Sequence, residues 1–381
     1  MTTKNRNKGN GSIQRRTSGS WQLRYYGPPD EHGRCKQVNE TVRGSRREAE
    51  RVLRERLSTI ESGGYIAKDK ETVGQFLARW LDTYGASNVT HRTLQGYRSS
   101  IRCYSGPIAN ISVQTLTARH IQGVYSGMLE KGLSATTVVQ FHRILHRALS
   151  IGVKWGILAR NVADAATPPR IDRQEMAMWD METIQRFLDV AIGSRYRDFY
   201  HLALLTGMRR SELAGLQWPN IDLVNGRLSV AKTLQWVTGK GLAVGQPKTA
   251  KSRRSIALSP DAVALLHEIR GRQIAQQVAV ADAWQHTGYV FTQATGGPVD
   301  PNGISRDFSG LVKAAGLPHL TLHGLRHAHA TMMLEEGINP KIVSERLGHS
   351  TIAITMDVYS HVLPGMQEAA VWALDAKLGR K

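Results

Sequence analysis

Two adjacent prolines constrain how this 381-residue chain can fold. Pro168 and Pro169 cannot lie inside a helix or a central strand, because proline lacks a backbone N–H and restricts the residue before it. A chain of this length is expected to form two or three domains. We therefore predict a linker over residues 161–174, a helical domain over residues 70–160 and a larger domain over residues 175–381.

The first 64 residues have the pattern of a small sheet followed by a helix. Apolar and polar residues alternate over residues 21–25, and a paired strand is expected over residues 35–42. Ser45 and Glu48 have the spacing of a capping box, which predicts the start of a helix. We expect residues 1–64 to form a separate domain with a three-stranded sheet and one helix.

Residues 70–160 carry apolar residues at helical spacing. A capping box at Thr72 predicts the start of a helix whose apolar stripe covers residues 76–84. Amphipathic runs over residues 117–130 and 135–152 predict further helices. This segment should therefore be all-α, with the apolar stripes forming its core.

The remaining segment mixes helical patterns with short strand patterns. Residues 199–205 lead into Gly207, which is typical of a helix end. Residues 227–233 and 252–258 are predicted as strands. The fold class expected for the whole chain is multidomain α+β, with a last domain that is mainly α and contains a small antiparallel sheet.

The excess of positive charge constrains the partner. The net charge is +19, of which residues 1–64 and 65–175 carry +7 each. Such an excess favours a polyanion, and its concentration in these segments suggests that they bind a phosphate backbone. A basic, solvated surface is the alternative. The arginines predicted to contact DNA are Arg46, Arg47, Arg51, Arg143 and Arg147.

Several other classes of protein do not fit this sequence. No apolar run approaches the roughly 20 residues that a membrane span needs, and the polar, basic start of the chain has no secretory signal. The two cysteines, Cys35 and Cys103, are too few for a disulfide framework or a cysteine-rich zinc site. We expect no membrane association, no cofactor and a cytoplasmic location.

Six residues in short polar motifs of the last segment are candidates for catalysis. The motifs are TGMRRSE with Arg209, QPKTAK with Lys248, LHGLRH with His323 and Arg326, RLGHS with His349, and MDVYSH with Tyr359. In this order and context they resemble the motifs of the tyrosine recombinases of the phage-integrase type. The resemblance extends over nearly the whole chain.

This resemblance implies a site-specific recombinase, or integrase, that cleaves and rejoins DNA strands through a covalent 3′-phosphotyrosyl intermediate. Its substrate would be the genome of a phage or of another mobile element. Residues 1–64 would be an arm-type DNA-binding domain, residues 70–160 a core-binding (SAM-like) domain and residues 175–381 the catalytic domain. Neither a metal ion nor ATP is implied.

The family's roles fit the chemistry of the six residues. Tyr359 would be the nucleophile, activated by its surroundings because a phenol has an unperturbed pKa of about 10. Arg209 and Arg326 can each hold nonbridging phosphate oxygens with two N–H groups and remain charged. Glu212, one helical turn after Arg209, is expected to orient the site.

By the same resemblance, Lys248 is the general acid that protonates the departing 5′-oxygen. His323 and His349 would form hydrogen bonds with the phosphate and assist proton transfer. The implied partners are double-stranded DNA, with core and arm attachment sites, and three further copies of the chain in a homotetramer. An excisionase and a DNA-bending host factor, in the nucleoid of a bacterial host, are further expected partners.

Some alternatives remain open from the sequence. His323 and His327 are spaced like two zinc ligands of a hydrolase, with His329 nearby, although no carboxylate lies between residues 320 and 333. A type IB topoisomerase would share the cleavage chemistry, and a DNA-binding regulator could retain a relict catalytic domain. The apolar residues at 369–378 could dock on a neighbouring protomer or on their own domain.

Overall fold

The computed structural model describes most of the chain. The described residues are 11–16, 19–29, 33–62, 64–67, 69–172, 179–237, 239, 241–246, 253–359, 371, 372, 375 and 378, and the side chains of 357–359 are not among what it describes. The chain forms two compact units, Met1–Arg173 and Gln174–Lys381. The finer division into three domains and a linker stays a prediction.

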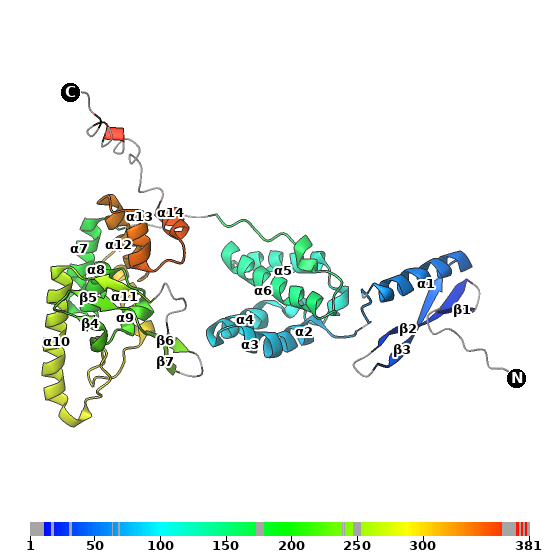
Figure 1. Ribbon diagram of the computed structural model, residues 1–381, viewed down its shortest axis with the longest axis horizontal. Coiled ribbons are helices and arrows are strands. Elements are labelled where there is room, and N and C mark those ends of the chain that lie inside the picture. Colours follow the sequence, from blue (N-terminus) through cyan, green and yellow to red (C-terminus); the bar gives the residue numbers. More distant parts are fainter. Residues whose placement is uncertain are drawn as a thin grey trace. The chain divides into compact units, whose positions relative to one another are not determined.

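A three-stranded antiparallel sheet opens the first unit (Figure 1). Its elements are β1 (Ser12–Arg15), β2 (Ser20–Pro29), β3 (Cys35–Arg43) and, after the sheet, helix α1 (Arg46–Glu61). Leu23 and Tyr25 of β2 are buried together with Ala49 and Leu53 of α1. The Ser45 side chain accepts a hydrogen bond from the Glu48 N–H at 3.2 Å, so the predicted helix start is confirmed.

Helices make up the rest of the first unit. They are α2 (Val73–Trp80), α3 (Ala86–Asn88), α4 (His91–Tyr104), α5 (Ala118–Glu130) and α6 (Ala135–Lys154), with 3₁₀ turns at Gly106–Ile108, Val113–Thr115 and Val162–Ala165. Their shared core includes Phe76, Trp80 and Phe141, each fully buried. The N-terminal sheet and this helical body have the architecture that the sequence predicted.

Two details of the helical body differ from the expectations. The apolar stripe over residues 76–84 does not follow one regular helix, because α2 gives way to a π-helical turn at Leu81–Gly85. The second detail concerns the start of the segment predicted as a linker. Ala163 and Ala166 are buried in the same cluster as the helices, so residues 162–166 belong to the helical core.

The second unit is mainly helical. Its helices are α7 (Met181–Val190), α8 (Arg197–Thr206), α9 (Arg210–Ala214), α10 (Pro260–Val280), α11 (Pro301–Ala314), α12 (Gly324–Glu335), α13 (Pro340–Leu347) and α14 (Ile352–Tyr359), with 3₁₀ turns at Ala191–Gly193, Trp218–Asn220 and Ala281–Ala283. Phe187, Tyr200 and Phe308 contact one another at the centre of the core. No helix in the described part of the chain is long and apolar enough to cross a membrane.

Short strands complete the second unit. They are β4 (Ile221–Asp222), β5 (Arg227–Ser229) and β8 (Ser255–Ala257) in one antiparallel sheet, and β6 (Thr233–Val237) and β7 (Gly241–Gly245) in a separate hairpin. The predicted single strand over residues 227–233 was wrong. Its two ends pair with different partners, because Ser229 lies opposite Ser255 whereas Thr233 lies opposite Gly245.

Gly207 ends α8 in a left-handed conformation, with φ of 62°. A Cβ atom here would lie 2.5 Å from the ring of His329 and 2.7 Å from the side chain of Leu347. Only glycine fits such a crowded left-handed position without displacing its neighbours. The ends of α8 and α13 and the middle of α12 therefore meet closely at this point, where the candidate residues gather.

Candidate active site

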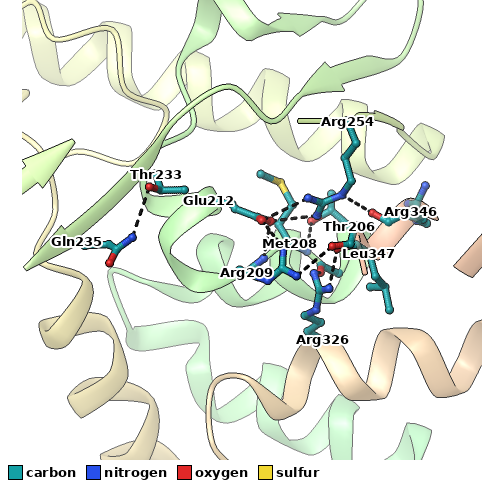
Figure 2. A network of polar contacts seen from close by, with 12 residues as sticks. Thr206, Met208, Arg209, Glu212, Thr233, Gln235, Arg254, Arg326, Arg346 and Leu347 are labelled. Carbon is teal, nitrogen blue, oxygen red and sulfur yellow. Dashed lines mark hydrogen bonds and ion pairs between the residues drawn. The ribbon is translucent and has the colours of Figure 1, made fainter. Parts of the chain in front are cut away.

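Arg209 is the residue that precedes the first turn of α9, and Glu212 is on that turn (Figure 2). The Arg209 Nη1 donates to Glu212 Oε1 at 2.7 Å, and the Arg209 backbone N–H donates to Glu212 Oε2 at 3.0 Å. The Arg209 Nη2 donates to the carbonyl of Gly348 at 3.1 Å. The side chain of Arg209 is 34% exposed and that of Glu212 only 2%. The buried Glu212 carboxylate thus holds the partly exposed guanidinium of Arg209.

A second arginine holds the same carboxylate. Arg254 Nη2 donates to Glu212 Oε2 at 3.0 Å and Arg254 Nη1 to Oε1 at 3.3 Å. Burial alone would raise the pKa of Glu212, but the hydrogen bonds and charges of Arg254 and Arg209 outweigh it and keep this pKa below its usual value. Glu212 is therefore a carboxylate at neutral pH.

Arg254 was not among the residues singled out from the sequence. It follows another arginine, Arg253, and composition does not separate the two. The strand pattern gives only a weak indication that Arg254 is buried. In an extended strand, Arg254 is on the same face as Ile256, which is 1% exposed.

Arg326 lies in the first turn of α12 and is 3% exposed. Its Nη1 donates to the carbonyl of Gly207 at 2.7 Å, and its Nη2 donates to that of Leu347 at 2.6 Å. Leu347 and Gly348 are consecutive, and the second of these carbonyls accepts from Arg209. Arg209 and Arg326, the two residues predicted to hold the phosphate, therefore both donate to the segment directly before His349.

The two candidate histidines lie in the field of these arginines. His323 keeps exposed surface, but the protein atoms that displace water around its ring, and the charges of His327, Arg326 and Arg209, lower its pKa to about 4. Burial, followed by the charges of Arg326 and Arg209, lowers the pKa of His349 to about 4 as well. Both rings are therefore neutral at pH 7 in the protein alone.

Residues 176–365, which contain this site, match the phage integrase family. The chain belongs to that family of tyrosine recombinases. The XerC-like tyrosine recombinase of Caldanaerobacter subterraneus is 28% identical over 350 residues, or 87% of this chain and 90% of that protein. The ICEBs1 integrase of Bacillus subtilis is 29% identical over 265 residues, covering 69% of this chain and 72% of its own.

Solved structures share the fold. A Tn1549 transposon integrase in complex with a circular intermediate DNA has a TM-score of 0.69 at 23% identity, over 80% of this chain and 99% of that one. A lambda integrase tetramer bound to a Holliday junction has a TM-score of 0.59 at 18% identity, over 93% of this chain and 96% of that one. These structures confirm the expected fold class. The family match makes the chain a DNA strand transferase of the tyrosine recombinase type.

Two residues predicted for the recombinase site are not fully visible in the structure. Lys248 lies outside the described residues, between β7 and β8. Tyr359 is the last residue of α14, and only its backbone is described. Helix α14 is itself tied to the site, because His349 Nδ1 lies 2.8 Å from the Oγ1 of the fully buried Thr355.

The histidines of the zinc hypothesis have other partners. The rings of His323 and His327 meet edge to face, with centroids 4.9 Å apart. The His329 Nδ1 lies 2.7 Å from the carbonyl of Leu204, and its Nε2 accepts from Arg346 Nε at 3.0 Å. Within the described ranges, no group of three His, Cys, Asp or Glu side chains could hold a metal ion.

The arginines predicted to contact DNA fall into two groups. Arg46 and Arg51 form ion pairs with carboxylates on α1, and Arg147 donates to the hydroxyls of Tyr84 and Tyr97 at 3.0 and 3.2 Å. Arg47 and Arg143 are exposed. All five lie at the surface, so each is accessible to a phosphate.

Proposed function

We propose that this recombinase integrates and excises a mobile element by cutting DNA with Tyr359 and holding the cut strand as a 3′-phosphotyrosyl ester. One observation carries the proposal. Arg209 donates to the carbonyl of Gly348 and Arg326 to that of the preceding Leu347, and two neutral histidines lie in the field of these arginines. Two fixed positive charges beside neutral proton acceptors suit a phosphoryl transfer.

The two arginines would stabilise the negative charge of the pentavalent phosphorus transition state in different ways. Arg209 is one-third exposed, so it can donate directly to a nonbridging oxygen. Arg326 is almost completely buried, and its charge acts at short range in a medium that screens it weakly. Arginine stays charged throughout the reaction, which makes a metal ion unnecessary for this role. Glu212 orients Arg209 from behind.

The proton transfers follow from the neutral histidines. As the Tyr359 oxygen forms its bond to phosphorus, the phenolic proton passes to a neutral imidazole of the His323 and His349 pair. As the bond from phosphorus to the 5′-oxygen breaks, Lys248 protonates the leaving oxygen. Position 359 lies one helical turn beyond Thr355, whose hydroxyl contacts His349, so α14 brings the nucleophile's position toward the site.

Two other surfaces support binding to attachment-site DNA. One is the face of the N-terminal sheet opposite α1, which carries the exposed residues Arg24 and Tyr26 on β2 and Arg43 on β3. The other is the start of α1, where Arg47 is exposed. Both would bind arm sites. Relatives solved on DNA include the Tn1549 integrase and a lambda integrase tetramer. We propose that this chain likewise binds DNA and acts as a tetramer. We further propose that it acts at the bacterial nucleoid with the help of an excisionase and a DNA-bending protein.

The C-terminal segment fits the tetramer. Val371 and Trp372 are 61% and 76% exposed, which is unusual for apolar side chains of this size. We propose that they dock on a neighbouring protomer. A topoisomerase that only relaxes supercoils has no need of a second DNA-binding surface such as the N-terminal sheet, which favours the recombinase over that alternative.

Trapping the covalent intermediate tests the proposal. A nicked core-site substrate that loses its 5′-hydroxyl fragment on cleavage should accumulate a protein–DNA adduct, and mass spectrometry should locate it on Tyr359. Tyr359→Phe removes one oxygen and little packing volume, so binding should persist while the adduct falls to background. An adduct on another residue, or normal recombination by the Phe variant, would falsify the assignment. DNA binding without any adduct in the wild-type protein would instead indicate a regulator.

A further inference from the structure

The hydrogen-bond network around the site extends beyond the residues that the motifs identify (Figure 2). Arg254 Nε donates to the carbonyl of Arg346 at 2.5 Å. The guanidinium of Arg346 in turn donates to the carbonyls of Ala257 at 2.9 Å and Leu205 at 3.0 Å. These contacts connect strand β8, helix α8 and the end of α13, which directly precedes His349.

The carboxylate of Glu212 is held from two sides. Oε1 accepts from Arg209 Nη1 and Arg254 Nη1, and Oε2 accepts from the Arg209 N–H and Arg254 Nη2. With a donor from each arginine on each oxygen, the carboxylate cannot rotate without losing hydrogen bonds. Its orientation fixes that of the Arg209 guanidinium, which is the more exposed of the two arginines predicted to hold the phosphate.

We infer that Arg254 is a positioning residue for strand cleavage, which fixes Glu212 against Arg209 and ties β8 to the end of α13. This inference rests on the proposed function. Lys248, the proposed general acid, lies six residues before Arg254 in the sequence. Its side chain is 7% exposed, which leaves it little surface for a direct contact with DNA.

Removal of Arg254 has a defined electrostatic consequence. The charged and titratable groups that act on Glu212 are Arg209 on α9, Arg254 ahead of β8 and His323 at the start of α12. Without Arg254, burial of Glu212 is opposed by Arg209 alone, so the pKa of Glu212 rises. A protonated Glu212 holds Arg209 less strongly, because the attraction between opposite charges is lost and one carboxyl oxygen becomes an O–H donor.

The test compares Arg254→Met with Arg253→Met, which removes the same charge from an exposed neighbour that donates to Gln246. Single-turnover formation of the covalent adduct is measured at saturating protein from about pH 5 to pH 9. At pH 7 we expect Arg254→Met to be about 10- to 100-fold slower, the range typical when a group that orients a catalytic ligand is lost. The deficit relative to wild type should shrink as pH rises and Glu212 ionises, and Arg253→Met should match wild type.

Thermal stability provides a second readout that does not depend on cleavage. In wild type the lowered pKa of Glu212 contributes stability above the unfolded pKa that is lost as pH falls. In Arg254→Met we expect burial to bring the pKa of Glu212 above its unfolded value, which reverses the sign, so stability is lost as pH rises. The difference in Tm between the two proteins should therefore widen from pH 5 to pH 8, while the difference in cleavage rate narrows.

Three results would overturn the inference: an equal loss of rate at every pH, an equal loss in Arg253→Met, or a lower Tm with an unchanged rate. If Arg254→Met does not fold, Arg254→Lys takes its place. Its single nitrogen cannot hold both Glu212 oxygens and the Arg346 carbonyl, so it should show a smaller deficit, and a wild-type rate would reject the role. Absence of any wild-type adduct refutes the proposed function instead, and the Tm comparison still tests Arg254.

Discussion

The arginines of the first unit and those of the second differ in their surroundings. On α1, the side chains of Arg46 and Arg51 are 73% and 60% exposed and pair with carboxylates three or four residues away. Around Glu212, the side chain of Arg254 is 7% exposed, and its partners come from distant parts of the chain. Water and salt screen the first kind of pair, so it fixes little. The second kind is costly to break, because the remaining charge is left buried.

This contrast distinguishes residues that set the affinity for DNA from residues that position the groups for strand cleavage. A surface arginine adds to phosphate binding in proportion to its charge, and many such residues can replace one another. A buried arginine defines the position of other groups, and none of its neighbours can take over. Substitutions in the two units should therefore differ both in size and in kind.

Among changes to the arginines, the largest effect is expected for Arg326→Lys. Lysine keeps the charge, but a single nitrogen cannot donate to both the Gly207 and Leu347 carbonyls in their present geometry. Single-turnover cleavage should fall by about 10²- to 10³-fold, the loss typical when one element of a preorganised site is removed. Arg306→Lys is the matched control, since that side chain is 80% exposed, and it should cleave like wild type. Equal rates in both variants would remove the contrast between buried and exposed arginines.

Deletion of residues 1–64 should have a large effect on recombination and a small one on cleavage. The segment carries a net charge of +7 and the open sheet face, but none of the catalytic motifs. Recombination between full attachment sites should drop, whereas adduct formation on core-site DNA persists. Circular dichroism controls for folding. Complete loss of core cleavage in a folded truncation contradicts the modular assignment.

A smaller effect is expected from a single surface arginine. Arg47→Ala should weaken arm-site binding modestly and lower the slope of log affinity against log salt by about one. Fluorescence anisotropy over a salt series measures both quantities. Arg306→Ala, on an exposed arginine of the other unit, should leave the slope unchanged. A change in sequence preference without a change in slope would show that Arg47 reads bases instead of phosphate.

The smallest effect, none, is expected from chelation. If buried arginines supply the charge stabilisation, adduct formation should continue at the same rate in excess EDTA. Activity that disappears with EDTA and returns with zinc or magnesium would revive the metal hypothesis for His323 and His327.

The sequence motifs identified candidate catalytic residues, but not the residues that hold them in position. Arg209, His323 and Arg326 could be predicted because the proposed reaction restricts which residue types serve, and their catalytic roles stay predictions. Arg254 was missed, since Arg253 beside it has the same chemistry and only the three-dimensional position of Glu212 tells them apart. The end of β5 was also missed, because no glycine, proline, asparagine or aspartate separates Ser229 from Thr233 in the sequence, although the hydrogen-bonding partner changes between them.

The two consecutive carbonyls before His349 couple the positions of the site's residues to one another. Arg209 and Arg326 both donate to this segment, and the histidine follows it, so any displacement of the end of α13 disturbs three groups at once. A substitution that displaces one of these groups is therefore expected to displace the others as well. Removing both arginines should cost less than the two single losses added together, as in other systems whose members act as a unit.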